Sequence, residues 1–163
     1  MNLYSLYNSI NNMTKRCLNL TRTTHPWSKL QSALYKVIAK ETSFQIHCCA
    51  YDTGECIPLP RYWITIGKDI VWDFPKNAIR DIGDWNFYDE TKGISRLIKA
   101  YVDCPKNELF SFPFYDRWKM LPFLQACDRR IGKRQLKKML EREEYSCVAW
   151  IIQKRLGFTH TIK

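Results

Sequence analysis

The residues best suited to bind a ligand form one strongly basic segment near the C-terminus. Residues 129–142 hold seven basic side chains and a single acidic one, Glu141. The basic residues are Arg129, Arg130, Lys133, Arg134, Lys137, Lys138 and Arg142. Cations at this density favour phosphate binding, because each neutralised phosphate releases counterions and adds affinity without reading a base sequence. We therefore name these seven residues as a candidate site for nucleic acid or another polyanion.

Two other interpretations of the basic segment stay open. Arg134, Lys137 and Lys138 lie three and four positions apart, so a helical face presents them together, and an acidic protein partner suits such a face as well. Alternatively, apolar residues such as Leu136 dock the segment on the core, and its cations are solvated or paired with acidic residues of the following turn. We expect Asp128, directly before the segment, to fix the neighbouring arginines rather than to perform chemistry.

The rest of the sequence contains no clear catalytic motif. None of the three histidines has a serine or an acid at motif spacing, and we find neither a Walker loop nor a GxGxxG fingerprint. A metal-dependent nuclease is a further alternative, on Asp69 with Asp73 or on residues 89–92 (Asp-Glu-Thr-Lys), which we place in a polar loop. A nuclease needs its carboxylates on a rigid element. We therefore predict a binding protein rather than an enzyme and assign no catalytic residue.

The seven cysteines indicate free thiols rather than disulfides or a metal site. They stand at positions 17, 48, 49, 56, 104, 127 and 147, an odd number without a repeated spacing or a CxxC pair. Cys48 and Cys49 are adjacent in an expected strand, where neighbouring side chains point to opposite faces, so they do not readily share one ion. We see no secretory signal ahead of them and expect a reduced, cytoplasmic protein without a metal or cofactor.

Charge is distributed unevenly along the chain. The first 40 residues hold six basic side chains and no acidic one, and Lys15, Arg16 and Arg22 fall in a stretch rich in Asn, Thr and Ser. Such a stretch is typical of a poorly ordered extension, of a basic nucleic-acid arm or of a targeting peptide. We treat residues 1–24 as a flexible basic extension whose three cations are secondary contacts for a polyanion.

The composition is that of one soluble domain. The 163 residues are 45% hydrophobic and 26% charged, which excludes a disordered or collagen-like chain. The formal net charge of +10 at pH 7 favours acidic partners. The longest stretch without charged residues is the first 14 positions, interrupted by Asn and Ser, whereas a membrane span needs about 20 apolar residues. We expect no membrane segment, one domain over residues 25–158 and a tail at 159–163.

Apolar periodicity predicts an α+β fold. Spacings of three and four predict a helix over about 27–40, and alternation predicts strands over 43–51, 61–66 and 70–74. The short breaks between the strands favour a three-stranded antiparallel meander. Because so small a sheet cannot bury itself, the N-terminal helix and a C-terminal array of about four helices must cover it.

The C-terminal helices follow from the same spacing rule. We expect them over 94–102, over 117–130 with a kink or a later start at Pro122, from Gly132 to about Arg142, and over 145–156 with Gly157 as the C-cap. The basic segment therefore covers the end of the second of these helices and the whole of the third.

Aromatic and basic residues alternate in the second expected strand. Tyr62, Ile64 and Ile66 share one face, while Arg61 and Trp63 lie on the other. Exposed rings beside arginine stack on bases in single-strand binders, but the helices must cover one of the two faces. We expect these rings to pack against the helical layer, with base stacking as the alternative.

Three blocks of the sequence are similar to a family of small bacterial proteins without an established activity. They are residues 27–30 (WSKL), residues 59–75 (LPRYWITIGKDIVWDFP) and residues 127–136 (CDRRIGKRQL). The resemblance spans about residues 26–156 and implies a bacterial or phage protein of the cytoplasm. It carries over no catalytic residue, and residues 1–24 depart from the short start that is usual in the family.

Overall fold

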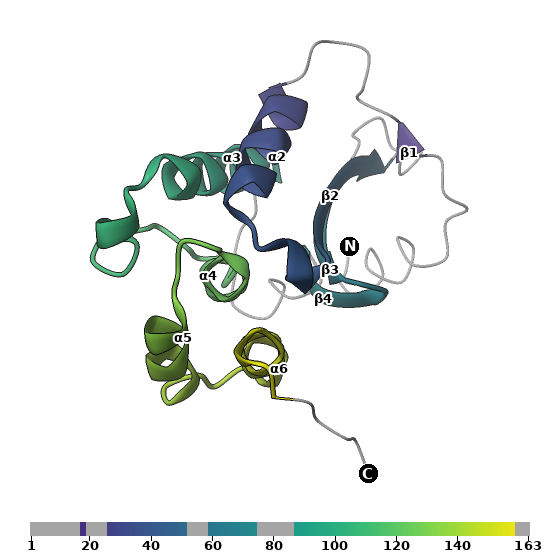
Figure 1. Ribbon diagram of the computed structural model, residues 1–163. Coiled ribbons are helices and arrows are strands. Elements are labelled where there is room, and N and C mark those ends of the chain that lie inside the picture. The colour runs from purple at the N-terminus through teal and green to yellow at the C-terminus, as the bar shows by residue number, and fades with distance from the viewer. Residues whose placement is uncertain (1–16, 19–25, 52–58, 75–86, 159–163) are drawn as a thin grey trace.

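Figure 1 shows the computed structural model of the chain, which describes residues 17–18, 26–51, 59–74 and 87–158. These residues form an α+β fold, as the sequence predicted. Helices α2, α3 and α4 lie along one side of an antiparallel sheet, and α5 and α6 continue the helical layer beyond it (Figure 1). No helix among the described residues has the length and apolarity that crossing a membrane requires.

The sheet has the strand order β1-β2-β3-β4, with every neighbouring pair antiparallel. Its three long strands are β2 (Phe44–Tyr51), β3 (Leu59–Ile66) and β4 (Asp69–Phe74). They confirm the predicted meander. The additional strand β1 (Cys17–Leu18) comes from the N-terminal extension and pairs with the end of β2. Two residues are too few to show an alternating pattern, so the sequence offered no signal for β1.

The helices cover the face of the sheet that holds Tyr62, Ile64 and Ile66, which alternation had placed together. Ile46 of β2 pairs with Ile64 of β3, which pairs with Trp72 of β4, and all three side chains are buried. Tyr62 and Phe74 extend this row, and their rings meet edge to face. The apolar side chains of the three strands therefore form the floor of the hydrophobic core.

Helix α2 (Pro26–Val37) ends three residues earlier than the periodicity predicted. Its next residue, Ile38, instead forms an isolated bridge with Asp128, and the Arg129 amide donates to the Val37 carbonyl at 2.9 Å. A short 3₁₀ turn, η1 (Lys40–Thr42), then leads into β2. The helix stops because a distant segment supplies hydrogen-bond partners for its last turn, which no local pattern reveals.

Helix α3 (Phe87–Asp103) corrects one expectation and confirms another. Residues 89–92, which we placed in a loop, belong to its first turns. Their polar composition concealed the helix, because apolar residues recur at helical spacing only from Ile94 onward. The helix ends just before Pro105, as expected, and the 3₁₀ turn η2 (Lys106–Glu108) follows.

Together with α3, the last three helices confirm the predicted C-terminal array of about four. Helix α4 (Leu121–Cys127) is shorter than expected and starts late, with Pro122 in its first turn. The Asp116 carboxylate accepts the N–H groups of Met120 and Leu121 at that end, at 3.0 and 2.6 Å. Helices α5 (Lys133–Leu140) and α6 (Ser146–Leu156) complete the fold, and α6 ends at Gly157 with φ of 85°, as the sequence predicted.

Candidate functional site

Helix α5 has one apolar side and one basic side. Leu136 is buried, and Met139 and Leu140, three and four residues later, are half-buried against the core. Lys133, Arg134, Lys137 and Lys138 are all exposed. This arrangement confirms that apolar contacts, chiefly with α6, dock the helix. The basic side chains are left for solvent or for a ligand.

The exposed cations have no partner within the described part of the chain. We define the basic face as Lys133, Arg134, Lys137 and Lys138 on α5, together with Arg129 before it and Arg142 after it. None of these side chains forms an ion pair or a hydrogen bond with another described residue. The expected pairing with Glu141, Glu143 and Glu144 is therefore not made. Glu143 instead accepts the backbone N–H of Tyr145 at 2.9 Å, at the start of α6.

Arg130, the seventh basic residue of the segment, has a structural role. All three nitrogens of its guanidinium group donate hydrogen bonds. Nε and Nη2 bind the fully buried Asp128 carboxylate, at distances down to 2.7 Å. Nη1 donates to the Cys104 carbonyl at 2.7 Å, and Nη2 donates to the Tyr101 carbonyl at 3.2 Å. Arg130 thus caps the end of α3, and we leave it out of the candidate site.

Asp128 is the centre of this buried network, which confirms the role expected for it. Besides binding Arg130, its carboxylate accepts the Tyr101 hydroxyl at 2.7 Å. Burial and the Asp128 carboxylate together hold the pKa of Tyr101 well above its usual range, so the hydroxyl stays a donor. The network joins the end of α3 to the chain between α4 and α5, and it therefore helps to position the basic face.

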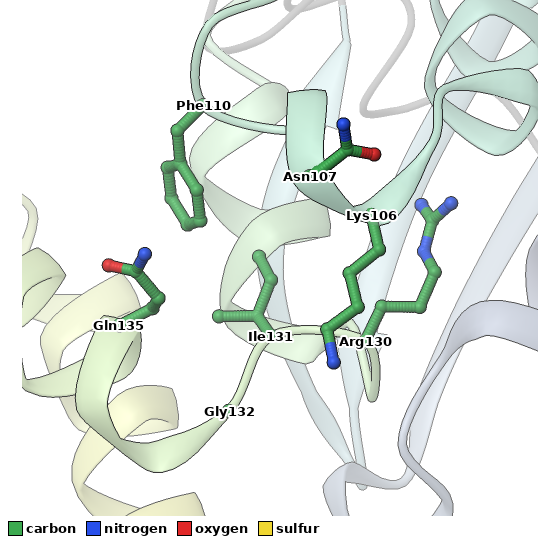
Figure 2. Close-up of a pocket in the computed structure, with 7 residues that line it drawn as sticks. All are labelled: Lys106, Asn107, Phe110, Arg130, Ile131, Gly132 and Gln135. Carbon is green, nitrogen blue, oxygen red and sulfur yellow. The ribbon is translucent and has the colours of Figure 1, made fainter.

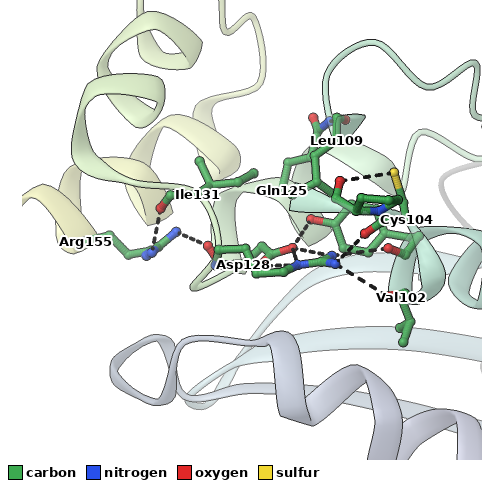
Figure 3. Close-up of polar contacts among 10 residues, drawn as sticks. Val102, Cys104, Leu109, Gln125, Asp128, Ile131 and Arg155 are labelled. Atoms are coloured by element: carbon green, nitrogen blue, oxygen red, sulfur yellow. Dashed lines mark hydrogen bonds and ion pairs between the residues drawn. The ribbon is translucent and has the colours of Figure 1, made fainter. Parts of the chain in front are cut away.

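Arg155 positions the loop before α5, a role that sequence reasoning missed. Its side chain is only 7% exposed, and Nη1 donates to the carbonyls of Ala126 and Asp128 at 2.9 and 3.0 Å (Figure 3). Nη2 donates to the Ile131 carbonyl at 3.3 Å. Arg155 in the last turn of α6 therefore fixes the loop that leads into α5. In the sequence it resembles an ordinary basic residue near a helix C-terminus.

A groove of about 440 Å³ opens beside α5. One wall comes from η2 and the residues after it, and the other comes from the chain that enters α5 (Figure 2). The lining residues are Lys106, Asn107, Phe110, Arg130, Ile131, Gly132 and Gln135. Sequence reasoning had named only Arg130 among them as a binding residue, because the two walls lie twenty or more positions apart in the chain. The only local signal was a lysine just before the aromatic run at 110–115.

The face of the sheet away from the helices holds a second cluster, built on Trp63. The His47 ring stacks on Trp63 with 4.8 Å between ring centroids, and the Arg61 guanidinium lies 4.9 Å from the same ring. Arg61 also makes two hydrogen bonds to Asp73, at 2.9 and 2.6 Å. Trp63 therefore packs against its strand neighbours and not against the helical layer that we expected to cover these rings. Burial lowers the pKa of His47, which keeps its ring neutral near pH 7.

The geometry does not bring together Asp69 and Asp73, one of the two pairs of carboxylates expected of a nuclease site. Asp73 is buried in its pair with Arg61, and Asp69 lies exposed at the other end of β4, about 13 Å away along an extended strand. Paired metal ions in nucleases lie about 4 Å apart. The side chains of residues 89–92 lie outside the described part of the structure. Among the described residues, no group of three His, Cys, Asp or Glu side chains is placed to hold a metal ion.

The remaining predicted contacts, Lys15, Arg16 and Arg22, also lie outside the described residues. No family model, curated protein or solved structure matches the chain significantly. The resemblance to small bacterial proteins therefore stays a hypothesis that rests on the three sequence blocks.

Proposed function

We propose that this protein is a non-enzymatic binding protein that contacts nucleic acid through the basic face of α5. The observation that carries the proposal is the set of four exposed cations on one eight-residue helix, none of which is bound by another described residue. The helix is already docked by Leu136 and its apolar neighbours. Its cations are therefore free to bind phosphates without any rearrangement of the core.

The spacing of these cations supports a role in binding rather than in stability. Lys133 and Lys137 are four residues apart, and so are Arg134 and Lys138. Like charges at this spacing destabilise a helix by about 0.2–0.5 kcal/mol for each pair. The phosphates of a bound polyanion offset this repulsion, and binding releases the counterions of the polyanion. The net charge of +10 adds long-range steering of an acidic partner.

The test is a titration of single-stranded and duplex DNA and RNA at several salt concentrations, read by fluorescence anisotropy. The variant R134E/K137E/K138E reverses three charges of the basic face. Its matched control, K29E/K36E/K40E, reverses three exposed lysines on α2 and η1. Both variants lower the net charge by six, from +10 to +4. Comparison of the two variants therefore separates the effect of where the charges lie from the effect of the total charge.

We expect the wild-type protein and the control to bind, with affinity falling log-linearly as salt rises. The α5 variant should lose binding, and any residual salt slope should be shallower by about two to three units, because three phosphate contacts are gone. Equal losses in both variants would show that only the total charge matters. No binding by the wild-type protein would end the proposal.

An acidic protein partner is the second candidate, and one observation favours it. Phe110, Phe112 and Tyr115 are exposed, at 49%, 40% and 70%, in the loop between α3 and α4. Aromatic residues of this kind are enriched at protein interfaces. Such a complex has an apolar centre and is therefore expected to resist salt that dissociates nucleic acid. The same salt titration distinguishes the two partners.

A further inference from the structure

The groove beside α5 has one aromatic wall and one apolar floor. Phe110 forms the wall, Gln135 faces it from α5, and Ile131 lies between them (Figure 2). Phe110 is 49% exposed, whereas Ile131 is only 2% exposed. Phe110 is therefore accessible to a flat ligand, and stacking on an aromatic side chain stabilises a nucleobase regardless of its identity.

The polar groups of the groove are of the kind that recognise base edges and phosphates. Asn107 and Gln135 each carry a side-chain amide, with two N–H donors and one carbonyl acceptor. These groups match the donors and acceptors on the edge of a base. Lys106 projects into the same space as a single cation (Figure 2). Gly132 leaves room as well, because a Cβ atom placed there would meet nothing within 4 Å.

The groove is continuous with the basic face. Gln135, Lys138 and Arg142 are spaced three and four residues apart, so they follow one side of α5 and its final turn. This line begins at the groove and runs along the cations. A nucleic-acid strand whose base enters the groove therefore has cations beside its next phosphates.

We propose that the groove binds one unstacked base of a single-stranded nucleic acid, with the base stacked on Phe110. This inference rests on the proposed function, since the basic face supplies most of the affinity. A base in a duplex is stacked and paired on both sides and does not reach such a groove without being extruded. The protein should therefore prefer single strands to duplexes of the same length.

Phe110→Ala tests the inference, with Phe158→Ala as its matched control. Phe158 is also an exposed phenylalanine, at 56%, but it does not line the groove. Loss of one base-stacking ring should lower single-strand affinity by about 5- to 160-fold, from about 1–3 kcal/mol per base. Duplex affinity and the salt slope should stay unchanged, and unchanged duplex binding also shows that the variant is folded. Phe110→Tyr keeps the ring and should keep the single-strand affinity.

A single strand with one 2-aminopurine reports base stacking directly. Its fluorescence should change on binding to the wild-type protein and to the Phe158→Ala control, but not on binding to Phe110→Ala. Equal effects of Phe110→Ala on single strands and duplexes, or no effect on either, would refute the base-binding groove while the basic face stands. If R134E/K137E/K138E retained full affinity, the proposed function would fail first. If polyglutamate displaced the single strand as well as an unlabelled oligonucleotide does, the groove would not be specific for a base.

Discussion

Arg129 and Arg130 are neighbours in the sequence with opposite environments. The Arg129 side chain is exposed, and no described residue binds it. The Arg130 side chain is 17% exposed and is held by the Asp128 carboxylate and by the last carbonyls of α3. Such a pair contributes little net stability by its formation, but removal of one partner leaves a buried charge without compensation.

We therefore predict that Arg130→Ala lowers the free energy of unfolding by about 3–5 kcal/mol. Arg129→Ala should change it by no more than about 0.5 kcal/mol, as is usual for an exposed side chain without contacts. Urea denaturation of the two variants measures both values. Equal, small effects would mean that the Asp128 network does not hold the end of α3.

A second residue-scale prediction concerns pH. Burial raises the pKa of the Cys127 thiol to about 12, whereas a thiol in an unfolded chain ionises near about 8.5. Between these values the unfolded chain releases a proton that the folded protein keeps, so stability falls as pH rises. The contribution of this thiol to the free energy of unfolding is fully present below about pH 8.5. Above that pH it decreases, by up to about 1.4 kcal/mol for each pH unit.

Unfolding measured at several pH values from about 7.5 to 10 should therefore give a shallower decline for Cys127→Ala than for the wild-type protein. The slopes of unfolding free energy against pH should differ by nearly the value for one proton, about 1.4 kcal/mol per pH unit. Cys147→Ala is the control for the removal of a thiol, because Cys147 is exposed in the folded protein. Identical slopes for all three proteins would show that Cys127 is more accessible than its burial indicates.

At the scale of elements, α5 separates the residues that hold it from the residues that bind. Leu136 is 1% exposed, so Leu136→Ala should lower the free energy of unfolding by about 2–5 kcal/mol. R134E/K137E/K138E should leave it nearly unchanged, because each solvated charge contributes at most about 1 kcal/mol. Thermal and urea denaturation check both. A charge-reversed variant that unfolds would make the basic face a structural feature.

The contact between α3 and the loop before α4 gives a second prediction at this scale. A Cβ atom at Gly93 would lie 2.5 Å from the Cη2 atom of the buried Trp118 side chain. Gly93→Ala should therefore destabilise the protein by about 1–3 kcal/mol through overpacking, despite the better helix propensity of alanine. A Cβ atom at Gly132 has no neighbour within 4 Å, so Gly132→Ala should lower the free energy of unfolding by less than about 1 kcal/mol. Differential scanning calorimetry compares the two; a Gly93→Ala variant as stable as the wild-type protein would show that Trp118 moves away freely.

At the scale of the whole molecule, the charge distribution predicts stabilisation by polyanions. A ligand that binds only the folded state raises its stability by RT ln(1 + [L]/Kd), about 2.7 kcal/mol at a hundredfold excess over Kd. We expect a single-stranded oligonucleotide to raise the Tm of the wild-type protein and of K29E/K36E/K40E, but not of R134E/K137E/K138E. Scanning fluorimetry with dye-free detection measures the shift. A rise of equal size in all three proteins would contradict a site on α5.

Much of the fold could be predicted because it depends on local patterns. Alternation separated Tyr62, Ile64 and Ile66 from Arg61 and Trp63 on the two faces of β3, and the spacing around Leu136 identified the docked side of α5. The end of α6 at Gly157 followed from the positive φ that glycine adopts readily. In each case, residues within one turn or one strand carry the signal.

What the sequence alone determined about this protein is therefore most of its elements, the side chains that share a face of each element, and the positions of its cations along the chain. Only the tertiary structure decided which cations are free, since Arg130 and Arg155 bind carbonyls of segments that lie 24 or more positions away. The same holds for the groove, whose walls come from residues 106–110 and 130–135, and for β1. Periodicity reports how one element meets the core, whereas hydrogen bonds and cavities between elements depend on how distant segments pack together.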